Sequence, residues 1–307
     1  MFIHSHTNKI RTKALELGFT QFGVAKAQYL HDDYERITEF LQNNWHADMY
    51  YMENNLDKRL DPRKLVNDAK SVIMLSYNYY APNKLKGLKI SKYAYGYDYH
   101  KVIKTKLKEL YNYIQQVIPL TQGRYFVDSA PVLEKSWAVK AGLGWIGKNT
   151  LLISKGKGSF FFLATIIIDQ ELIYNNYEEK NLCGNCTKCI DACPTQAIIA
   201  PKKLDSGKCI SYLTIENKSS EIAQEFKSKF KNWIFGCDIC QDVCPWNNKF
   251  SVEHNEPLFD IREETLKLQN ADWLDLNEET FKTLFKYSAL NRAGFKGLKR
   301  NINFICK

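Results

Sequence analysis

Cysteine is the residue type with the clearest chemical pattern in this chain of 307 residues, which contains nine of them. Four lie in the segment C-G-N-C-T-K-C-I-D-A-C-P, residues 183–194, with the spacing C-x2-C-x2-C-x3-C-P. Thiolates with this spacing bind 4Fe-4S clusters, three cysteines holding one cluster and the fourth reaching a second. The segment therefore predicts two clusters.

A second run, C-D-I-C-Q-D-V-C-P at residues 237–245, supplies further thiolates, and Cys209 lies between the two runs. If the last cysteine of each run binds the cluster of the other run, each cluster receives four ligands and only Cys306 is left over. The predicted ligands are Cys183, Cys186, Cys189 and Cys244 for cluster 1, and Cys193, Cys209, Cys237 and Cys240 for cluster 2.

Three other interpretations of the cysteines compete with this one. Zinc sites usually combine two well separated C-x2-C pairs, and the C-x3-C-P endings are not expected of them. Disulfides require an oxidising compartment, but residues 1–20 contain no apolar segment or cleavage signal for export. Unconnected core cysteines would not fall into two such runs. The spacing favours the two clusters.

The composition is that of a folded protein, with 45% apolar and 13% aromatic residues. A chain of this length divides into about two domains. No apolar run approaches the roughly eighteen residues of a membrane-spanning helix. We expect a cytoplasmic protein without a membrane partner.

The net charge of +9 suggests a polyanionic partner. From residue 281 to the end the sequence has seven basic residues and no acidic one. From charge alone, these residues are as compatible with a solvated tail as with a surface that binds nucleic acid. The seven are Lys282, Lys286, Arg292, Lys296, Lys299, Arg300 and Lys307.

Residues 93–100 read Y-A-Y-G-Y-D-Y-H, four tyrosines alternating with small or polar residues. The alternation favours an edge strand with one aromatic face. The alternative is a wall for a flat cofactor, with Asp98 and His100 beside it. A basic helix is expected to follow over residues 101–116.

Asp128 lies in F-V-D-S-A-P-V-L-E, residues 126–134, which reads as a strand end, a turn and a helix start. Pro131 suits the first helical turn, so Asp128 or Ser129 is expected to cap the helix. The alternative role for Asp128 is a proton donor facing a cleft, kept protonated by burial away from cations. The residues alone favour the cap.

The segment G-L-G-W-I-G-K-N-T, residues 142–150, matches two phosphate-binding patterns, and both matches fail on context. The dinucleotide fingerprint needs a strand before it and a helix after it, whereas here a helix leads in and a strand over 150–154 leads out. In the near P-loop, Asn149 replaces the required serine or threonine. We predict a glycine-rich turn whose amides, with Lys148, hold an anionic cofactor tail.

The remaining pattern is of the α/β (α+β) class, and residues 169–180 read as a polar linker into the cysteine-rich part. Helices are predicted over 8–18, 33–43, 261–268, 278–284 and 291–304, and strands over 71–77 and 159–168.

Across nearly its whole length the chain strongly resembles the epoxyqueuosine reductase family. The motifs that carry the resemblance are the two cysteine runs, Y-G-Y-D-Y-H at 95–100, D-S-A-P-V-L-E-K at 128–135, the turn at 142–150 and R-A-G-F-K-G-L-K-R-N at 292–301. The resemblance implies a cobalamin-dependent oxidoreductase that reduces epoxyqueuosine to queuosine at the wobble position of tRNA. Electrons would pass through the two clusters.

The family resemblance also implies three regions. Residues 1–175 would form a nitroreductase-like cobalamin domain, and residues 176–250 a bacterial-ferredoxin-like domain with two 4Fe-4S clusters. Many relatives continue into a long HEAT-like helical region. Residues 251–307 would form a short, basic version of that helical region.

For the site, the resemblance matches Asp128 to the family's proton donor and Asp98 to a second acid near the cofactor. For Asp128 the resemblance therefore favours the role of proton donor over that of helix cap. The sequence has no D-x-H-x-x-G, in keeping with base-off cobalamin without a histidine ligand. Implied cofactor contacts are Arg59, Tyr97, Asp98, Asp128, Lys135, Gly144, Trp145, Lys148, Asn149 and Ser159, and implied tRNA contacts are Arg292, Lys296, Lys299 and Arg300.

The expected partners are tRNA carrying epoxyqueuosine in its anticodon loop and an unidentified low-potential electron donor, with the protein itself a monomer. Two alternatives stay open. One is a cobalamin and iron-sulfur reductive dehalogenase, and the other is a dedicated iron-sulfur electron-transfer protein.

Overall fold

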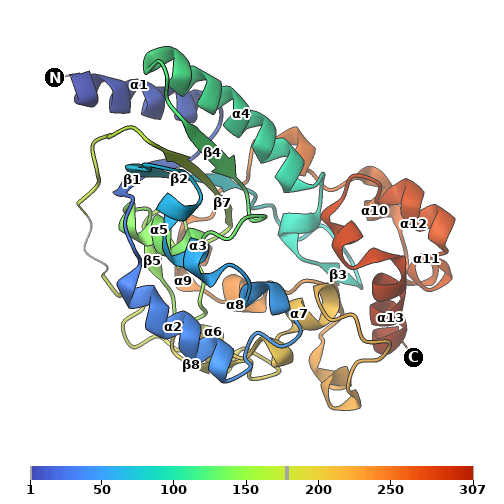
Figure 1. Ribbon diagram of the computed structural model, residues 1–307. Helices are drawn as coiled ribbons and strands as arrows, with labels where there is room; N and C mark the ends of the chain where they lie inside the picture. Colours follow the sequence, from blue (N-terminus) through green and yellow to red (C-terminus); the bar gives the residue numbers. More distant parts are fainter. Residues whose placement is uncertain (1, 177–179, 307) are drawn as a thin grey trace.

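The computed structural model describes residues 2–176 and 180–306, so residues 177–179 of the predicted linker lie outside the described part. At its centre is a four-stranded sheet with strand order β1-β2-β7-β4, in which all neighbours are antiparallel (Figure 1). The strands are β1 (Gln21–Lys26), β2 (Ser71–Asn78), β7 (Phe161–Ile168) and β4 (Gly123–Phe126).

Helices cover both faces of this sheet, because its central strands are apolar on both sides (Figure 1). Successive side chains of a strand point to opposite faces. Ile73 and Leu75 of β2 accordingly pack with α1 and α4, whereas Val72 and Met74 pack with α2, α3 and α5. The helices are α1 (Phe2–Glu16), α4 (Tyr99–Val117), α2 (His31–Gln42), α3 (Leu56–Leu60) and α5 (Glu134–Lys140).

The cysteine-rich part is built from short elements. Its strand β10 pairs in parallel with β3 (Lys89–Ile90), which comes from the first part of the chain. The pairing ties the two parts together. The elements are α6 (Lys188–Asp191), β8 (Ile198–Ala200), β9 (Lys203–Leu204), α7 (Ile210–Ile215), β10 (Trp233–Phe235), α8 (Ile239–Asp242) and α9 (Pro245–Phe250).

The C-terminal part is helical and lies beside β3 and α7 (Figure 1). Its core includes Trp273 and Leu298, which join Ile90 from β3 and Phe235 from β10 in one buried cluster. All three parts of the chain therefore share this core. The helices are α10 (Glu263–Lys267), α11 (Asn270–Asp275), α12 (Glu278–Leu284) and α13 (Gly294–Cys306).

The long elements match the predicted ones, but the edge strand at residues 93–100 was wrong. Lys92–Ala94 forms a 3-10 helix, and the Asp98 side chain accepts a hydrogen bond from the amide of His100 and so begins α4. A side-chain cap of this kind satisfies an otherwise unpaired helical amide. The tyrosines therefore do not share one face of a strand.

The glycine-rich turn follows α5, as predicted, and leads into the hairpin of β5 (Trp145–Ile146) and β6 (Leu152–Ile153). This order of elements confirms that the two phosphate-binding matches were correctly rejected. Within residues 2–176 and 180–306, no helix combines the length and the apolar character needed to span a membrane.

Candidate active site and cysteine centres

Asp128 occupies a tight turn between β4 and α5. Its φ is +55°, in the left-handed region, and the Ser129 amide donates to the Val127 carbonyl at 2.5 Å. Non-glycine residues rarely adopt such a conformation, which costs about 1–3 kcal/mol and is often found at functional sites. Because α5 begins only at Glu134 and has no side-chain cap, the predicted capping role of Asp128 or Ser129 was wrong.

The Asp128 carboxylate ends a short chain of polar groups. Its Oδ2 accepts a hydrogen bond from the Tyr99 hydroxyl at 2.7 Å and lies 3.5 Å from Nε2 of His100. The other ring nitrogen of His100, Nδ1, lies 2.7 Å from Oδ1 of Asp98. The imidazole therefore bridges two carboxylates, an arrangement that orients the ring and holds a proton on it.

This bridge shifts the pKa values of all three groups. Burial would lower the pKa of His100, but the hydrogen bonds to Asp128 and Asp98 outweigh burial and raise it to about 9. The hydrogen bond from His100 lowers the pKa of Asp128, although burial opposes it. The expectation that Asp128 lies away from cations was therefore wrong, and the pair holds its proton on His100 at neutral pH.

A second carboxyl lies behind Asp128. Glu134 Oε1 accepts a hydrogen bond from the Asp128 amide at 3.2 Å and another from the Thr165 hydroxyl at 3.4 Å. Burial, followed by repulsion from Asp128, raises the Glu134 pKa to about 8. This carboxyl is therefore largely protonated at neutral pH.

The acid site can be reached from solvent. The Asp128 side chain is 64% exposed, and Lys135 on α5 is also exposed. The Nζ of Lys135 donates to the Thr150 carbonyl at 3.0 Å, which holds this side chain beside the turn at 142–150.

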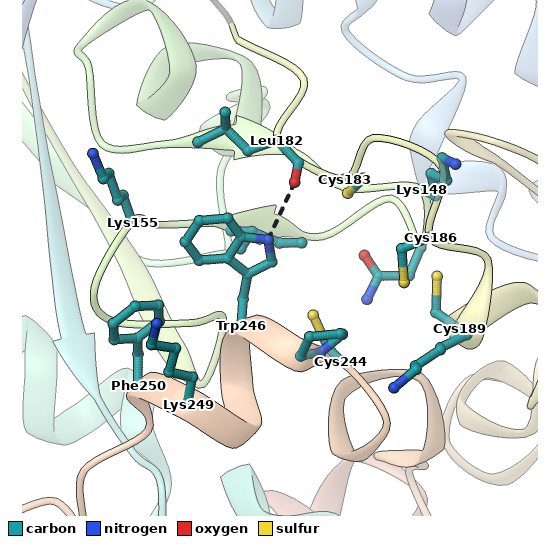
Figure 2. A pocket seen from close by; sticks show the side chains of 14 residues that line it. Lys148, Lys155, Leu182, Cys183, Cys186, Cys189, Cys244, Trp246, Lys249 and Phe250 are labelled. Carbon is teal, nitrogen blue, oxygen red and sulfur yellow. Dashed lines mark hydrogen bonds between the residues drawn. The ribbon is translucent and has the colours of Figure 1, made fainter.

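One set of cysteines lines a cavity of about 520 Å³, shown in Figure 2. In this view their sulfur atoms face a common space on one side of Trp246. Burial, then repulsion from the neighbouring thiols, raises the pKa of Cys189, so these thiols lie within electrostatic reach of one another. The set is the one predicted for cluster 1: Cys183, Cys186, Cys189 and Cys244.

The other set is partly exposed, as are three of the four cysteines of the first set. Burial raises the pKa of Cys240 well above its usual range, and repulsion from Cys237 and Cys209 adds to the shift. Cys193 in turn adds to the shifts of Cys209 and Cys237. The four thiols predicted for cluster 2 thus lie within electrostatic reach of one another. Cys189 also acts on Cys240, which places the two sets side by side.

Hydrogen-bond donors surround both sets, as they do in iron-sulfur proteins, where such donors tune the potential. The Ala197 amide donates to Sγ of Cys193 at 3.3 Å. Trp145, 1% exposed, packs against Cys183 and Cys244, and its buried Nε1 has no hydrogen-bond partner in the described structure. The Trp145 side chain thus belongs to the same buried group as two of the predicted cluster 1 ligands.

The second cysteine run is fixed by a buried ion pair. Asp238, 1% exposed, accepts a hydrogen bond from the Lys92 amide at 2.9 Å, and its Oδ2 lies 3.4 Å from the Lys92 ammonium. The same ammonium lies 2.7 Å from Asp242. These contacts connect the segment before α4, which carries Asp98, to the ligands of cluster 2.

The predicted cofactor contacts fall into two groups. Around the acids lie Tyr97, Asp98, Asp128 and Lys135, with Arg59 held by the carbonyls of Tyr51 and Asn54. The other five face the cysteine-rich part. Asn149 donates a hydrogen bond to the Cys240 carbonyl, and Ser159 is hydrogen-bonded to Gln241 and Asn247. Gly144 packs on Ile153, Trp145 packs on the cluster 1 cysteines, and Lys148 lines their cavity.

Most of the predicted tRNA contacts have partners within the chain. Lys299 donates to the carbonyls of Leu274 and Leu276, and Arg292 forms a two-pronged ion pair with Glu216 at 2.7 and 2.8 Å. Arg300 donates to the carbonyls of Leu213, Asn217 and Ser219. Lys296 is exposed, and Lys307 lies outside the described residues.

Sequence reasoning missed four residues of the acid site: Tyr99, His100 as a bridging group, Glu134 and Tyr287. The spacing of Asp98 and His100 at a helix start could have predicted their contact, because a capping aspartate also reaches the side chain two residues later. No sequence pattern could have predicted the position of Tyr287. Its carbonyl accepts the Asp98 amide at 2.6 Å, a contact across nearly two hundred residues of chain.

Two family models match the chain. The model described as "4Fe-4S double cluster binding domain" matches residues 182–247. The model described as "Epoxyqueuosine reductase QueG, DUF1730" matches residues 59–129. Together they include both cysteine runs and the loop that ends in Asp128.

Curated relatives are similar along nearly the whole chain. The epoxyqueuosine reductase of Cellulophaga algicola is 52% identical over 98% of each chain. That of Pseudomonas aeruginosa is 39% identical, over 94% of this chain and 81% of the relative.

Solved structures agree in fold. An epoxyqueuosine reductase with an epoxyqueuosine-modified tRNA-Tyr stem loop has a TM-score of 0.87 and 27% identity, covering 97% of this chain and 80% of that one. A Bacillus subtilis epoxyqueuosine reductase, with its aspartate catalytic loop swung out of the active site, has a TM-score of 0.86, 26% identity and the same coverage. A reductive dehalogenase, at 15% identity and a TM-score of 0.50 over 81% of this chain and 33% of that one, shares the fold alone.

The full-length similarity to curated relatives, the family model over residues 59–129 and the matching structures all name the same family. The chain belongs to the epoxyqueuosine reductase family.

Proposed function

We propose that this protein reduces epoxyqueuosine in the anticodon loop of tRNA to queuosine, using cobalamin and two 4Fe-4S clusters. The observation that carries the proposal is the position of a proton-holding acid pair, His100 and Asp128, in the same fold as two sets of four cysteines. Opening an epoxide to an alkene consumes two electrons and two protons and releases water. The two regions fit these two needs.

For the protons, we assign Asp128 as the group that faces the substrate. It is the most exposed member of the bridge, and His100 resupplies it from the ring nitrogen 3.5 Å away. Asp98 orients the ring through the other nitrogen, which makes it a positioning residue. Glu134 holds a further proton behind the Asp128 amide and fits the second protonation.

For the electrons, we assign Cys183, Cys186, Cys189 and Cys244 to cluster 1, and Cys193, Cys209, Cys237 and Cys240 to cluster 2. We place the cluster 2 set nearer the acids, because Tyr93 contacts both Phe235 of β10 and Tyr99, and the charges of Asp128 and Asp238 both act on its hydroxyl. Electrons would then pass from cluster 1 to cluster 2 and on to the acid site.

We place cobalamin beside Asp128, Lys135 and Tyr97, three implied cofactor contacts that solvent can reach. When bound, cobalamin supplies a reduced cobalt centre that assists opening of the epoxide. His100 is engaged by two carboxylates, which supports base-off binding without a histidine ligand. To this chain's own residues we assign the tasks of orientation and proton supply.

An exposed aromatic pair beside the acids fits the RNA. Tyr97 and Tyr287 are stacked, with ring centroids 5.8 Å apart and planes 13° from parallel, and they are 40% and 42% exposed. Lys101 and Lys286 lie over the Tyr287 ring at 5.3 and 5.2 Å. Aromatic surfaces with adjacent cations bind unpaired nucleotides. We place the loop nucleotides next to the modified base here, with Lys296 reaching phosphate.

The finer description of the fold follows the same proposal. Residues 1–175 form a nitroreductase-like cobalamin domain, 176–250 a ferredoxin-like domain and 251–307 a short HEAT-like region. The shared core of the three parts supports their acting as one unit, and we propose a monomer that takes electrons from a low-potential donor.

The test is anaerobic turnover of tRNA carrying epoxyqueuosine with reduced methyl viologen, with and without added cobalamin. Digested nucleosides are then weighed. The proposal predicts loss of one oxygen from the modified nucleoside only when cobalamin is present. Unchanged nucleoside with both clusters intact would refute it.

A further inference from the structure

The cavity of cluster 1 has two sides, which Figure 2 shows on either side of Trp246. The four cysteines occupy one side. On the other side lie Lys155, Lys249 and Phe250, with Lys155 above the other two in this view. Trp246 is fixed between the two sides, because its Nε1 donates to the Leu182 carbonyl at 3.3 Å and its ring packs against the buried Trp145.

The cluster 1 cysteines open onto a cavity at the surface. Cys183, Cys186 and Cys189 are partly exposed, and they line the cavity together with Trp246 and with Leu182, which is 39% exposed. The cluster 2 cysteines are also partly exposed, but none of them lines this cavity. A donor that docks at the mouth of the cavity therefore meets cluster 1 first.

The cavity has a strongly basic lining. Four of its fourteen lining residues are lysines, and none of the fourteen is acidic. Lys155 and Lys249 are exposed, and neither has an ion-pair partner among residues 2–176 and 180–306. Positive groups gathered around a concave surface attract negatively charged partners and accelerate their association.

The same surface has an apolar centre. Trp246 and Phe250 are stacked, with centroids 5.6 Å apart and planes 24° from parallel, and the Lys249 ammonium lies 5.3 Å from the Phe250 ring. An aromatic centre with a charged rim is the composition of a small transient protein interface. A small-molecule donor would have no need of Lys155 and Lys249, which lie on the side of Trp246 away from the cysteines.

We propose that this face, Lys155, Trp246, Lys249 and Phe250 around the mouth of the cluster 1 cavity, docks an acidic, one-electron donor protein. The proposal rests on the proposed function, since it identifies where electrons for that reaction enter. In each encounter the donor is oxidised by one electron and cluster 1 is reduced by one. Two encounters supply the electrons for one epoxide.

The test uses a reduced bacterial flavodoxin as an acidic protein donor and reduced methyl viologen as a small cationic one. Cluster reduction is followed by the loss of visible absorbance in the reconstituted protein. The variant Lys155→Glu/Lys249→Glu is expected to lower the flavodoxin rate constant about tenfold or more at low salt. The viologen rate is expected to stay the same or rise.

A matched control separates this effect from net charge. Lys9→Glu/Lys227→Glu makes the same charge change at exposed lysines on α1 and on the turn at 224–229, and should leave both rates unchanged. An unchanged flavodoxin rate in the first variant, or an equal loss with both reductants, would overturn the docking site. Queuosine formation driven by viologen in that variant reports on the proposed function separately.

Discussion

The acid site and the ion pair that holds the second cysteine run differ most in their contact with water. The Asp128 side chain is 64% exposed and His100 is 38% exposed, whereas Asp238 and its partner Lys92 in the cysteine-rich part are 1% and 2% exposed. Groups that exchange protons must reach solvent or substrate, and their charge changes with pH. Thiolates that hold a cluster gain from exclusion of water, which lowers the potential and protects the metal.

We infer from this difference that the acid site supplies protons and the cysteine-rich part supplies electrons separately. The two regions meet at Tyr93, between Tyr99 and Phe235, and at the link between Lys92 and Asp238. A change in one region should therefore leave the chemistry of the other intact unless it breaks that link. The predictions below test this separation.

The largest effect is expected for Cys240→Ala. Loss of one ligand from the cluster 2 set should remove about half of the bound iron and abolish turnover. Iron and acid-labile sulfide analysis measures the first effect, and nucleoside mass the second. Cys306→Ala, at an exposed cysteine outside both sets, is the matched control and should retain full iron. Full iron in the Cys240 variant would contradict the assignment.

Lys92→Met tests the link between the regions. It leaves Asp238 buried without its cation, which should destabilise the fold by about 3–5 kcal/mol. Lys84→Met removes an exposed pair with Glu253 at 3.6 Å and should cost no more than about 1 kcal/mol. Denaturant unfolding of the protein with its clusters compares the two. Equal losses would show that the buried pair has no special role.

The pH profile of turnover tests the proton store. His100 has a pKa of about 9, raised above its ordinary value, so its proton is present below that pH and is lost as pH rises through it. Glu134, with a pKa of about 8, loses its proton first, so turnover should begin to fall above pH 8 and fall more steeply above pH 9. Burial would lower the pKa of His100, and the hydrogen bonds and charges of Asp128 and Asp98 raise it. His100→Gln should remove the steeper fall above pH 9 and leave a low profile that still falls above pH 8. A wild-type profile that stays level to pH 10 would exclude His100 as the store.

The sequence predicted the elements whose signals are local. The buried strand β2 and the helix α12 were placed almost residue for residue, because an apolar run and an amphipathic period are visible within a few residues. The grouping of cysteines into two sets was also predicted, since the spacing within each run constrains it.

Contacts between distant segments were not predictable in the same way. The proton on His100 depends on Asp98, two residues away, but also on Asp128, which β4 brings from the far end of α4. The capping role expected for Asp128 was locally reasonable, and the left-handed turn replaced it. Lys299 and Arg300 were expected to contact tRNA, and no sequence pattern shows that they donate to backbone carbonyls of residues 213–219 and 274–276.

The separation of protons from electrons is tested most directly in Asp128→Asn, which keeps the shape of the side chain. The variant is reduced with viologen, mixed with cobalamin and epoxyqueuosine-containing tRNA, and followed for cluster reoxidation and product together. We predict cluster reduction at the wild-type rate, followed by retained electrons and a loss of about 10²–10⁴ in queuosine formation. Slow cluster reduction, or queuosine at the wild-type rate, would contradict the account.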